Sequence, residues 1–215
     1  MSRAEARERN RRALLDAALQ VVSRDGYRAR LEEIAERADL TTGAIYSLFG
    51  SKNGLVVALV TDYLRPHYEE IEQAVPPGLE LLAAVDAFAR YYRRSCDAPG
   101  ALAGLTLQIT LQDMTLHDPD LGAQLAASVR GHEEHLVALF TGRPHNGSIV
   151  TSHQAQRLAT ALRALFVGLS QGVILGLAHG ADEQYFADAA CALASDVSLL
   201  DHDSGAPRGA REPEP

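Results

Sequence analysis

Residues 40–55 have the sequence Leu-Thr-Thr-Gly-Ala-Ile-Tyr-Ser-Leu-Phe-Gly-Ser-Lys-Asn-Gly-Leu, and this stretch decides the fold. Thr41 is a suitable N-cap for a short helix, because its side-chain oxygen can accept a hydrogen bond from the first helical turn. Gly50 ends that helix, and Ser51 caps the helix that follows. The stretch therefore predicts a short capped helix, a glycine stop and the start of a second capped helix.

A compact amphipathic helix is predicted directly upstream, over residues 31–38. Its apolar residues recur at the i, i+3, i+4, i+7 spacing of one buried helical face. They are Leu31, Ile34, Ala35 and Ala38. Asp39 supplies the turn, because Asp tolerates the left-handed backbone region better than most residues. Helix, tight turn and short helix is the arrangement that places a protein helix in the DNA major groove.

The outward face of the helix over residues 41–50 is small and polar once its apolar residues face the core. Thr41 and Thr42 offer hydroxyl and methyl groups to base edges, whereas Tyr46 and Ser47 suit phosphate oxygens. This face has no Arg, Asn or Gln for bidentate base contacts. We therefore expect phosphate contacts to supply most of the affinity, and DNA shape to contribute to the choice of sequence.

Three cations near this helix are candidate phosphate ligands. Lys52 lies in the first turn of the next helix, where its charge and the helix N-terminus favour an anion together. Arg28 and Arg30 lie at the entry to the helix over residues 31–38. For these two arginines, a role as solvated surface residues is equally well supported.

Short motifs in this region resemble the N-terminal domain of the tetracycline-repressor (TetR) family. The resemblance covers roughly residues 10–56. It rests on Gly26-Tyr27, Ile34-Ala35, Gly43-Ala44-Ile45-Tyr46, Phe49, Ser51-Lys52 and Leu55. The resemblance implies an all-helical homodimer with an N-terminal DNA-binding domain and a larger ligand-binding and dimerisation domain. Members of the family are mostly repressors that a small molecule releases from DNA.

The resemblance also implies roles for individual residues. It implies that Tyr46 and Lys52 contact phosphates, and that Thr42, Gly43 and Ala44 face the groove. The chain departs from the family pattern at Asp39, where glycine is common, and at Leu48, where a histidine or tyrosine is common.

The charge of the chain is unevenly distributed. The 215 residues carry a formal net charge of −8, which taken alone argues against a nucleic-acid protein. Residues 1–52 contain ten Lys+Arg and eight Asp+Glu, a balance of +2, so residues 53–215 hold the remaining ten and twenty, a balance of −10. This distribution predicts a DNA-facing N-terminus on an acidic body that does not itself touch phosphate.

Helical periodicity dominates the chain, and strand alternation is almost absent. We expect an all-α fold of about nine helices, over residues 3–24, 31–38, 41–50, 51–74, 79–96, 101–116, 120–140, 152–179 and 183–200. Residues 1–52 would form the helix-turn-helix domain and residues 53–200 the ligand-binding and dimerisation domain. The tail over residues 201–215 is rich in Pro, Gly and charge, which predicts disorder.

A ligand pocket is predicted around the helix over residues 101–116. This helix is apolar on all sides with neutral polar groups interspersed, which is typical of a central helix beside a mostly apolar pocket. The candidate lining residues are Phe88, Tyr91, Gln108, Met114, Phe166 and Gln171. Simple core packing is the alternative for each of them. Since no clear buried charge is visible in the sequence, a neutral or apolar small-molecule effector is favoured over an ionic one.

A dimer interface is predicted on the last two helices. Gly168, Gly172 and Gly176 recur every four residues, and such small faces let helices approach closely. One face of the last helix carries Phe186, Ala190, Leu193 and Val197. With the resemblance, two helices from each subunit would form a four-helix interface. Close packing inside one subunit is the alternative.

Several other classes of site are not supported. Two cysteines, Cys96 and Cys191, give neither a disulfide framework nor a zinc pattern. His132-Glu133-Glu134-His135 spaces its histidines one residue too closely for the metalloprotease helix motif, so a solvated polar face is favoured. No Ser/His/Asp set, P-loop or dinucleotide loop occurs. We expect no metal, no cofactor and no enzymatic activity.

The N-terminus lacks the apolar core of a signal peptide, and the most apolar run, residues 164–178, is too short to span a membrane. A cytoplasmic protein without membrane association is therefore expected. The sequence predicts a ligand-responsive repressor that binds a pseudopalindromic double-stranded DNA operator. The alternative is an all-helical small-molecule-binding protein or enzyme without DNA binding, and the scarcity of base-reading side chains favours it.

Overall fold

The computed structural model describes residues 2–195, except for the side chains of residues 27, 63–66, 128–129 and 132. The fold in this range is all-α, as predicted, with a 3₁₀ turn (η1) and one short hairpin. The elements are α1 (Arg3–Asp25), η1 (Gly26–Arg28), α2 (Leu31–Arg37), α3 (Thr42–Phe49), α4 (Lys52–Ala74), α5 (Leu81–Ser95), α6 (Ala101–His117), α7 (Pro119–Phe140), β1 (Pro144–His145), β2 (Ser148–Ile149), α8 (Ser152–Ile174) and α9 (Glu183–Ser195). The predicted tail and Val197 lie outside the described residues.

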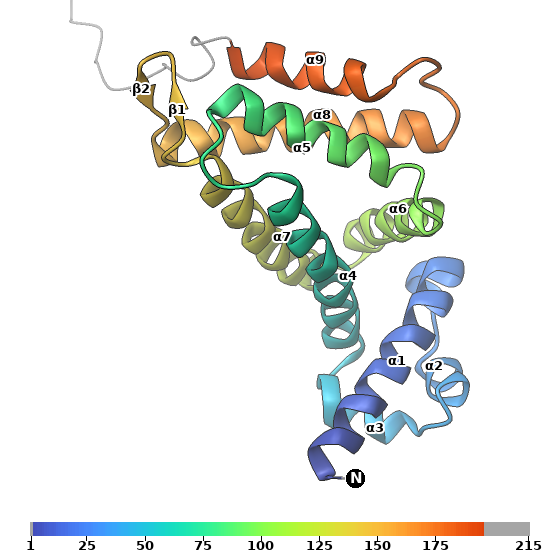
Figure 1. Ribbon diagram of the computed structural model, residues 1–215. Helices are drawn as coiled ribbons and strands as arrows, with labels where there is room; N and C mark the ends of the chain where they lie inside the picture. Colours follow the sequence, from blue (N-terminus) through green and yellow to red (C-terminus); the bar gives the residue numbers. More distant parts are fainter. Residues whose placement is uncertain (1, 196–215) are drawn as a thin grey trace, which may run out of the picture.

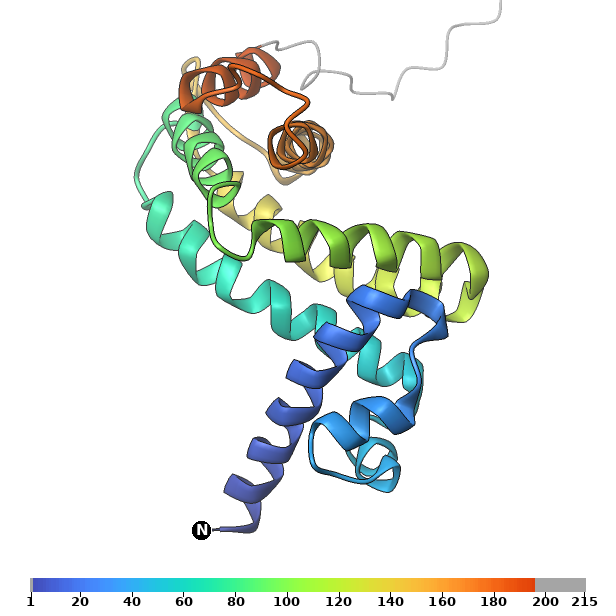
Figure 2. The same ribbon diagram turned by 90° about the vertical axis from the view of Figure 1, so that its right-hand side faces the viewer.

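The helices are arranged in three groups (Figures 1 and 2). Helices α5, α8 and α9 form an upper layer, in which α5 packs along α9. Helices α4 and α7 run side by side from this layer toward the lower end, where α1, α2 and α3 gather. Helix α6 crosses between the two ends and contacts α7, α8, α1 and η1.

The lower hydrophobic core joins the first three helices to the rest of the chain. Ile34 of α2 and Ile45 of α3 are buried in it against α1. The same core contains Leu55 to Val60 of α4, and it also takes Leu107 and Met114 from α6. The packing therefore continues across the boundary that the sequence suggested after residue 52, because one face of α4 seals the helix-turn-helix. The division into domains at that point stays a prediction.

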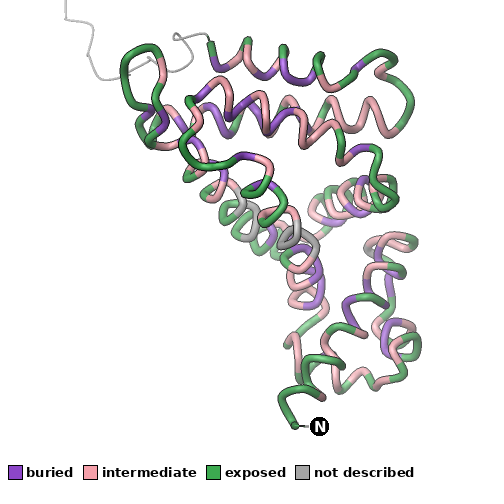
Figure 3. Tube along the Cα trace, in the orientation of Figure 1, coloured by how far each residue is buried: buried purple, intermediate pink, exposed green. Residues whose placement is uncertain are grey.

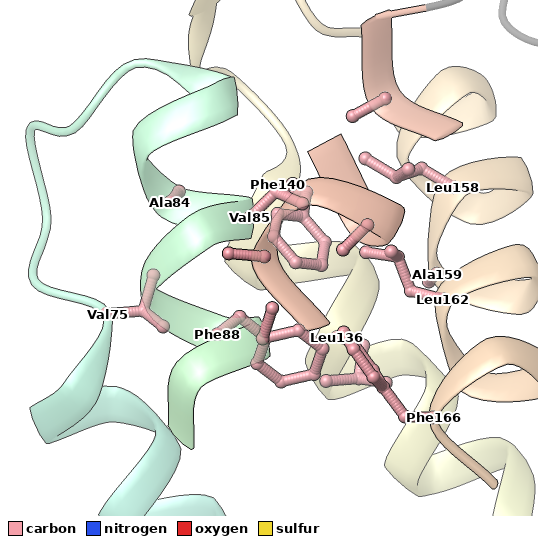
Figure 4. Close-up of a cluster of buried hydrophobic side chains, with 14 of the residues drawn as sticks. Val75, Ala84, Val85, Phe88, Leu136, Phe140, Leu158, Ala159, Leu162 and Phe166 are labelled. Atoms are coloured by element: carbon pink, nitrogen blue, oxygen red, sulfur yellow. The ribbon is translucent and has the colours of Figure 1, made fainter. Parts of the chain in front are cut away.

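The upper core is built around four aromatic side chains, Phe88, Phe140, Phe166 and Phe186, each at most 1% exposed. Figure 4 shows Phe88, Phe140 and Phe166 converging from α5, α7 and α8. The ring of Phe88 meets those of Phe140 and Phe166 edge-on, with centroids 5.6 and 5.5 Å apart. The buried residues follow the inner sides of the helices (Figure 3), so each upper helix is amphipathic toward this core.

Helix α8 ends earlier than predicted, at Ile174 rather than at residue 179. The backbone N–H groups of Leu177 and Ala178 both donate to the carbonyl oxygen of Gly172, at 2.7 and 2.9 Å. Gly176 has a φ of +69°, which glycine adopts without strain. The glycines therefore close the C-terminus of the helix, and helical periodicity alone could not show this.

The connection between α7 and α8 contains a hairpin that the sequence interpretation missed. Strands β1 and β2 pair antiparallel, with Pro144 opposite Ile149 and His145 opposite Ser148. Asn146 and Gly147 have positive φ values of +47° and +78°, as the two central residues of a type I′ turn require.

Candidate nucleic-acid interface and internal cavity

The turn between α2 and α3 has the geometry that the sequence predicts. Asp39 has a φ of +54°, and the N–H of Leu40 donates to the carbonyl oxygen of Ala35 at 2.9 Å. The Thr41 hydroxyl oxygen accepts a hydrogen bond from the N–H of Ala44 at 3.3 Å, so Thr41 is the N-cap of α3. These local bonds fix the entry angle of α3 without help from distant parts of the chain.

Helix α3 turns one side inward and leaves the other open. Ile45 is fully buried in the lower core, whereas the neighbouring Tyr46 is 56% exposed. Of the other predicted DNA contacts in this segment, three residues are exposed and two are half-buried: Thr41, Gly43 and Ser47 are exposed, and Thr42 and Ala44 are half-buried. The open side is therefore the polar side that the sequence assigns to DNA.

The start of α4 adjoins the end of α3 and carries Lys52. The Ser51 hydroxyl oxygen accepts from the N–H of Gly54 at 2.9 Å, which caps α4. Lys52 is half-buried, and this burial lowers the pKa of its ammonium group. The first turns of α3 and α4 contain no acidic residue. The positive end of the α4 dipole and the Lys52 charge therefore act together in the same place.

Gly54 is a residue whose importance the sequence interpretation missed. A Cβ atom at this position would overlap the carbonyl oxygen of Phe49, so only glycine lets α4 begin directly against the end of α3. Glycine in the first turns of a helix is otherwise unfavourable, and that could have signalled such a close approach. The glycine fixes the position of Lys52 relative to α3.

The arginines of this region divide into paired and outward-facing groups. The guanidinium of Arg24 binds Asp25 at 2.6 Å and Glu33 at 2.8 Å, and these partners raise the pKa of Arg24. Arg28 and Arg30 are exposed, and the Nε atom of Arg30 lies 4.0 Å from a carboxylate oxygen of Glu32. Both outward arginines therefore remain candidates for phosphate contacts.

Residues 14–59 match the sequence model of the bacterial regulatory proteins of the tetR family, over the segment that holds α2, α3 and the start of α4. This N-terminal segment is therefore similar to the tetR family of bacterial regulatory proteins. A curated relative, the HTH-type transcriptional repressor KstR of Mycolicibacterium smegmatis, is 42% identical over 55 residues. That alignment covers 25% of this chain and 27% of the relative, so the chain matches about a quarter of the relative's length.

Two solved structures show that the likeness in fold extends over most of the chain. A TetR-family member from Streptomyces coelicolor has a TM-score of 0.63 at 23% identity, over 86% of this chain and 97% of its own. The regulator FadR from Bacillus subtilis, in complex with stearoyl-CoA, has a TM-score of 0.59 at 16% identity, over 88% and 97%. At these identities the similarity establishes the fold alone.

A cavity of about 1270 Å³, partly open to solvent, lies between α1, α4, α5, α6, α7 and α8. Ordinary small-molecule sites enclose about 300–1,000 Å³, so this cavity has room for a large ligand. Three of the predicted pocket residues line it, namely Tyr91, Gln108 and Gln171. The Tyr91 hydroxyl donates to a carboxylate oxygen of Glu70 at 2.9 Å and lies 3.0 Å from Nδ1 of His67.

The other three predicted pocket residues have to be corrected. Phe88 and Phe166 belong to the upper core (Figure 4), and Met114 belongs to the lower core. None of the three is among the residues that line the cavity. All three lie on helices that border both a core and the cavity, and an apolar residue is compatible with either side.

The predicted dimer interface also needs correction. Phe186 and Ala190 are fully buried within a single chain, and Leu193 packs against the edge of the same core, because this face of α9 covers α5. Gly176 lies beyond the end of α8, and a Cβ at Gly172 would approach Cβ of Ala178 to 2.9 Å. Gly168 faces open space and therefore remains a candidate contact.

The described residues contain no cluster of three His, Cys, Asp or Glu side chains that could hold a metal ion. Within the same residues, no single helix has the length and apolar composition needed to cross a membrane. Helices α3 and α4 meet those criteria only when they are counted together across a bend of 67°.

Proposed function

We propose that the protein is a ligand-responsive transcriptional repressor that binds double-stranded DNA through α3 and the start of α4. One observation carries the proposal: the capped α3 buries Ile45 and presents Tyr46 outward beside Lys52 and the N-terminus of α4. The exposed Tyr46 hydroxyl on α3, the Lys52 ammonium group and the N-terminus of α4 are groups that suit a phosphate backbone. The repressor name of the curated relative supports the proposal.

The proposed DNA contacts are the residues that the sequence analysis assigned to this role. They are Arg28, Arg30, Thr41, Thr42, Gly43, Ala44, Tyr46, Ser47 and Lys52. A homodimer would place two copies of α3 in successive major grooves, about 34–36 Å apart on a pseudopalindromic operator. The open positions at the upper end of the molecule, including Gly168, Leu175 and Leu177, are where we place the contact between the two copies.

Helix α6 would couple the cavity to the DNA-binding end. Leu107, Gln108 and Leu111 of this helix line the cavity, and Leu107 and Met114 are buried in the lower core, so Leu107 belongs to both. Thr110 lies close to Gly26 of η1, within 3.5 Å of where a Cβ of that glycine would stand. A ligand that repositions α6 therefore acts directly on the helices that hold α3. It can change DNA affinity only by binding the two states with different affinity.

A hydrogen bond also attaches the DNA-binding end to the start of α7. The side-chain amide of Asn53, in the first turn of α4, donates to a carboxylate oxygen of Asp118 at 3.0 Å. Asp118 is also the N-cap of α7, where it accepts from the N–H of Leu121 at 2.9 Å. The start of α4 is therefore attached to the connection between α6 and α7.

The competing function is a helical ligand-binding protein without DNA binding, which the size of the cavity favours. The bound stearoyl-CoA of the Bacillus subtilis structure supports a ligand role for such a cavity. It does not favour either function with respect to DNA binding. We propose no enzymatic reaction.

Selection from random double-stranded DNA, followed by a binding titration at two salt concentrations, separates the two functions. The proposal predicts an enriched pseudopalindrome whose affinity falls about 10³–10⁵-fold between 50 and 200 mM salt, if six to ten phosphates are contacted. A failure to enrich any sequence, together with weak binding that is the same for all DNA, would leave the ligand-binding protein as the better account.

A further inference from the structure

Arg163 is a charged residue in an apolar part of α8. It lies between Leu162 and Ala164, one turn before the buried Phe166, and it lines the cavity. The residues that line the cavity from α8 share one helical face, at i, i+4, i+7, i+8 and i+11. They are Arg163, Val167, Ser170, Gln171 and Ile174. Arg163 is therefore the cationic end of a face that is otherwise neutral.

The guanidinium of Arg163 is held without a partner from the described part of the chain. Its Nε atom is buried and makes no hydrogen bond, and no carboxylate oxygen lies within the 4.0 Å of an ion pair. A buried polar atom without a hydrogen bond is unfavourable, and one that belongs to a charged group is more so. Arginine in such a position is well suited to bind a planar anion with two parallel hydrogen bonds.

The other charged groups around the cavity are already engaged or exposed. Asp62 accepts from Arg11 at 3.2 Å, and Glu70 accepts from the Tyr91 hydroxyl. Arg94 pairs with Glu183 at 3.0 Å, and Asp16 is exposed at the lower end of the cavity. Among the described arginines that line the cavity, Arg163 is therefore the candidate to pair with a negatively charged group of a ligand.

The surroundings of Arg163 favour a carboxylate that is attached to an apolar body. The ring of Tyr92 stacks on Phe166 with centroids 4.8 Å apart and also lines the cavity. Burial raises the pKa of Tyr92 to about 12, to which Tyr68 adds, whereas the Arg163 charge acts in the opposite direction. The Tyr92 hydroxyl therefore stays protonated at neutral pH and can donate. Farther along the cavity, the walls are apolar at Leu105 and Leu111.

We propose that the cavity binds an apolar carboxylic acid whose carboxylate pairs with Arg163 and whose hydrophobic body extends along α6. The proposal rests on the proposed function in that this acid would be the effector that controls DNA binding. An anionic effector replaces the neutral or apolar effector that the sequence predicted. Arg163 lies inside an apolar run of the sequence, and helical periodicity does not show that this residue lines the cavity.

The test compares an acid with its neutral counterpart on the full-length protein. Dansyl-aminoundecanoic acid and its primary amide share an apolar chain and a fluorophore, and differ only in charge at one end. Fluorescence titration should show that the wild-type protein binds the acid about ten- to a hundredfold more tightly than the amide. Arg163→Met should abolish that preference by weakening acid binding while amide binding stays within about twofold.

Two further variants make the result specific. Arg163→Lys keeps the charge but loses the planar fork, so it should retain only part of the preference. Arg157→Met removes an arginine from the same helix outside the cavity lining, and it should behave as the wild type. The melting temperature of ligand-free Arg163→Met should equal or exceed that of the wild type, because a buried Nε atom without a hydrogen bond has been removed.

Equal binding of acid and amide by the wild type, binding of neither, or an unchanged preference in Arg163→Met would each overturn the proposal. No DNA is present in these titrations. A protein that prefers the acid but fails to bind any DNA selectively would therefore contradict the proposed repressor function and leave the ligand assignment standing. A protein that binds its operator but shows no preference for the acid would support the repressor function and overturn the ligand assignment.

Discussion

The lower and upper ends of the molecule are held together over very different distances along the chain. At the lower end, the Thr41 and Ser51 hydroxyls each bond a backbone N–H only three residues away. At the upper end, Arg93 donates to the carbonyl oxygen of Ala181 at 2.7 Å, and Cys191 approaches that of Leu82 at 3.6 Å across 109 residues. The local sequence thus determines the conformation of the proposed DNA-binding surface. At the upper end, contacts with helices far away in the chain determine which face of each helix is buried.

This difference has consequences for how each end responds to substitution. The upper core is closed by interlocking aromatic rings, so removing volume there should cost stability and leave the reading face intact. The lower end depends on caps and one glycine contact, so small local changes there should alter the placement of α3 and α4.

The largest expected effect is that of Phe88→Ala. The side chain is fully buried between Phe140 and Phe166, so its loss should reduce the free energy of unfolding by about 3–5 kcal/mol. For a chain of this size the melting temperature should fall by roughly 6–20 °C. Thermal unfolding followed by circular dichroism measures this. Unchanged stability together with lost ligand binding would restore Phe88 as a pocket residue.

Gly54→Ala should have the next largest effect, at the opposite end of the molecule. The added Cβ meets the Phe49 carbonyl oxygen, which belongs to the backbone and cannot rotate away. We expect a loss of about 1–3 kcal/mol, as for overpacking in a core, together with weaker DNA binding. Chemical denaturation and a DNA titration check the two effects. A variant as stable as the wild type would show that the corner between α3 and α4 is looser than described.

Asp118→Ala tests the attachment of α4 to the connection between α6 and α7 and predicts a dependence on pH. Hydrogen bonds from the Leu121 N–H and from Asn53 hold the pKa of Asp118 below its usual value. A lowered folded-state pKa stabilises the fold above the unfolded-state pKa of about 3.9, and this contribution is lost as the pH falls through the folded-state value.

The melting temperature of Asp118→Ala should therefore lie below that of the wild type at pH 7, and the gap should narrow as the pH falls below about 4. Melting curves of both proteins across this pH range provide the measurement. A gap that is the same at every pH would mean that the ionised carboxylate of Asp118 contributes nothing.

The smallest effect, and the one of opposite sign, is that of Gly168→Ala. A Cβ at this position meets nothing within 4 Å, and alanine is favoured over glycine inside a helix. The free energy of unfolding should rise by about 0.5–1 kcal/mol. Melting curves at two protein concentrations check this. A fall in stability that depends on protein concentration would place Gly168 in a close contact with a second copy.

The sequence predicted the lower end well for a physical reason. Caps, a helix-stopping glycine and the Asp39 turn act over three or four residues, so their signals are adjacent in the chain. What it missed there is Gly54, whose partner atom lies five residues back in another helix.

The upper end was harder to predict because an amphipathic helix shows which residues are apolar but not which neighbour will cover them. Phe186 and Ala190 formed a plausible dimer face until α5 was placed against them. Phe88 and Phe166 likewise belong to a core rather than to the cavity. Arg163 gave no periodic signal, and its significance depends on the lack of a carboxylate partner in three dimensions.

We propose above that the open side of α3 and the start of α4 bind the DNA backbone. The most direct test measures the DNA affinity of the wild type, Lys52→Ala and Arg157→Ala over a series of salt concentrations. We expect weaker binding by Lys52→Ala and a slope of log affinity against log salt that is smaller by about one, with Arg157→Ala unchanged. Identical slopes and affinities for all three proteins would contradict the proposal.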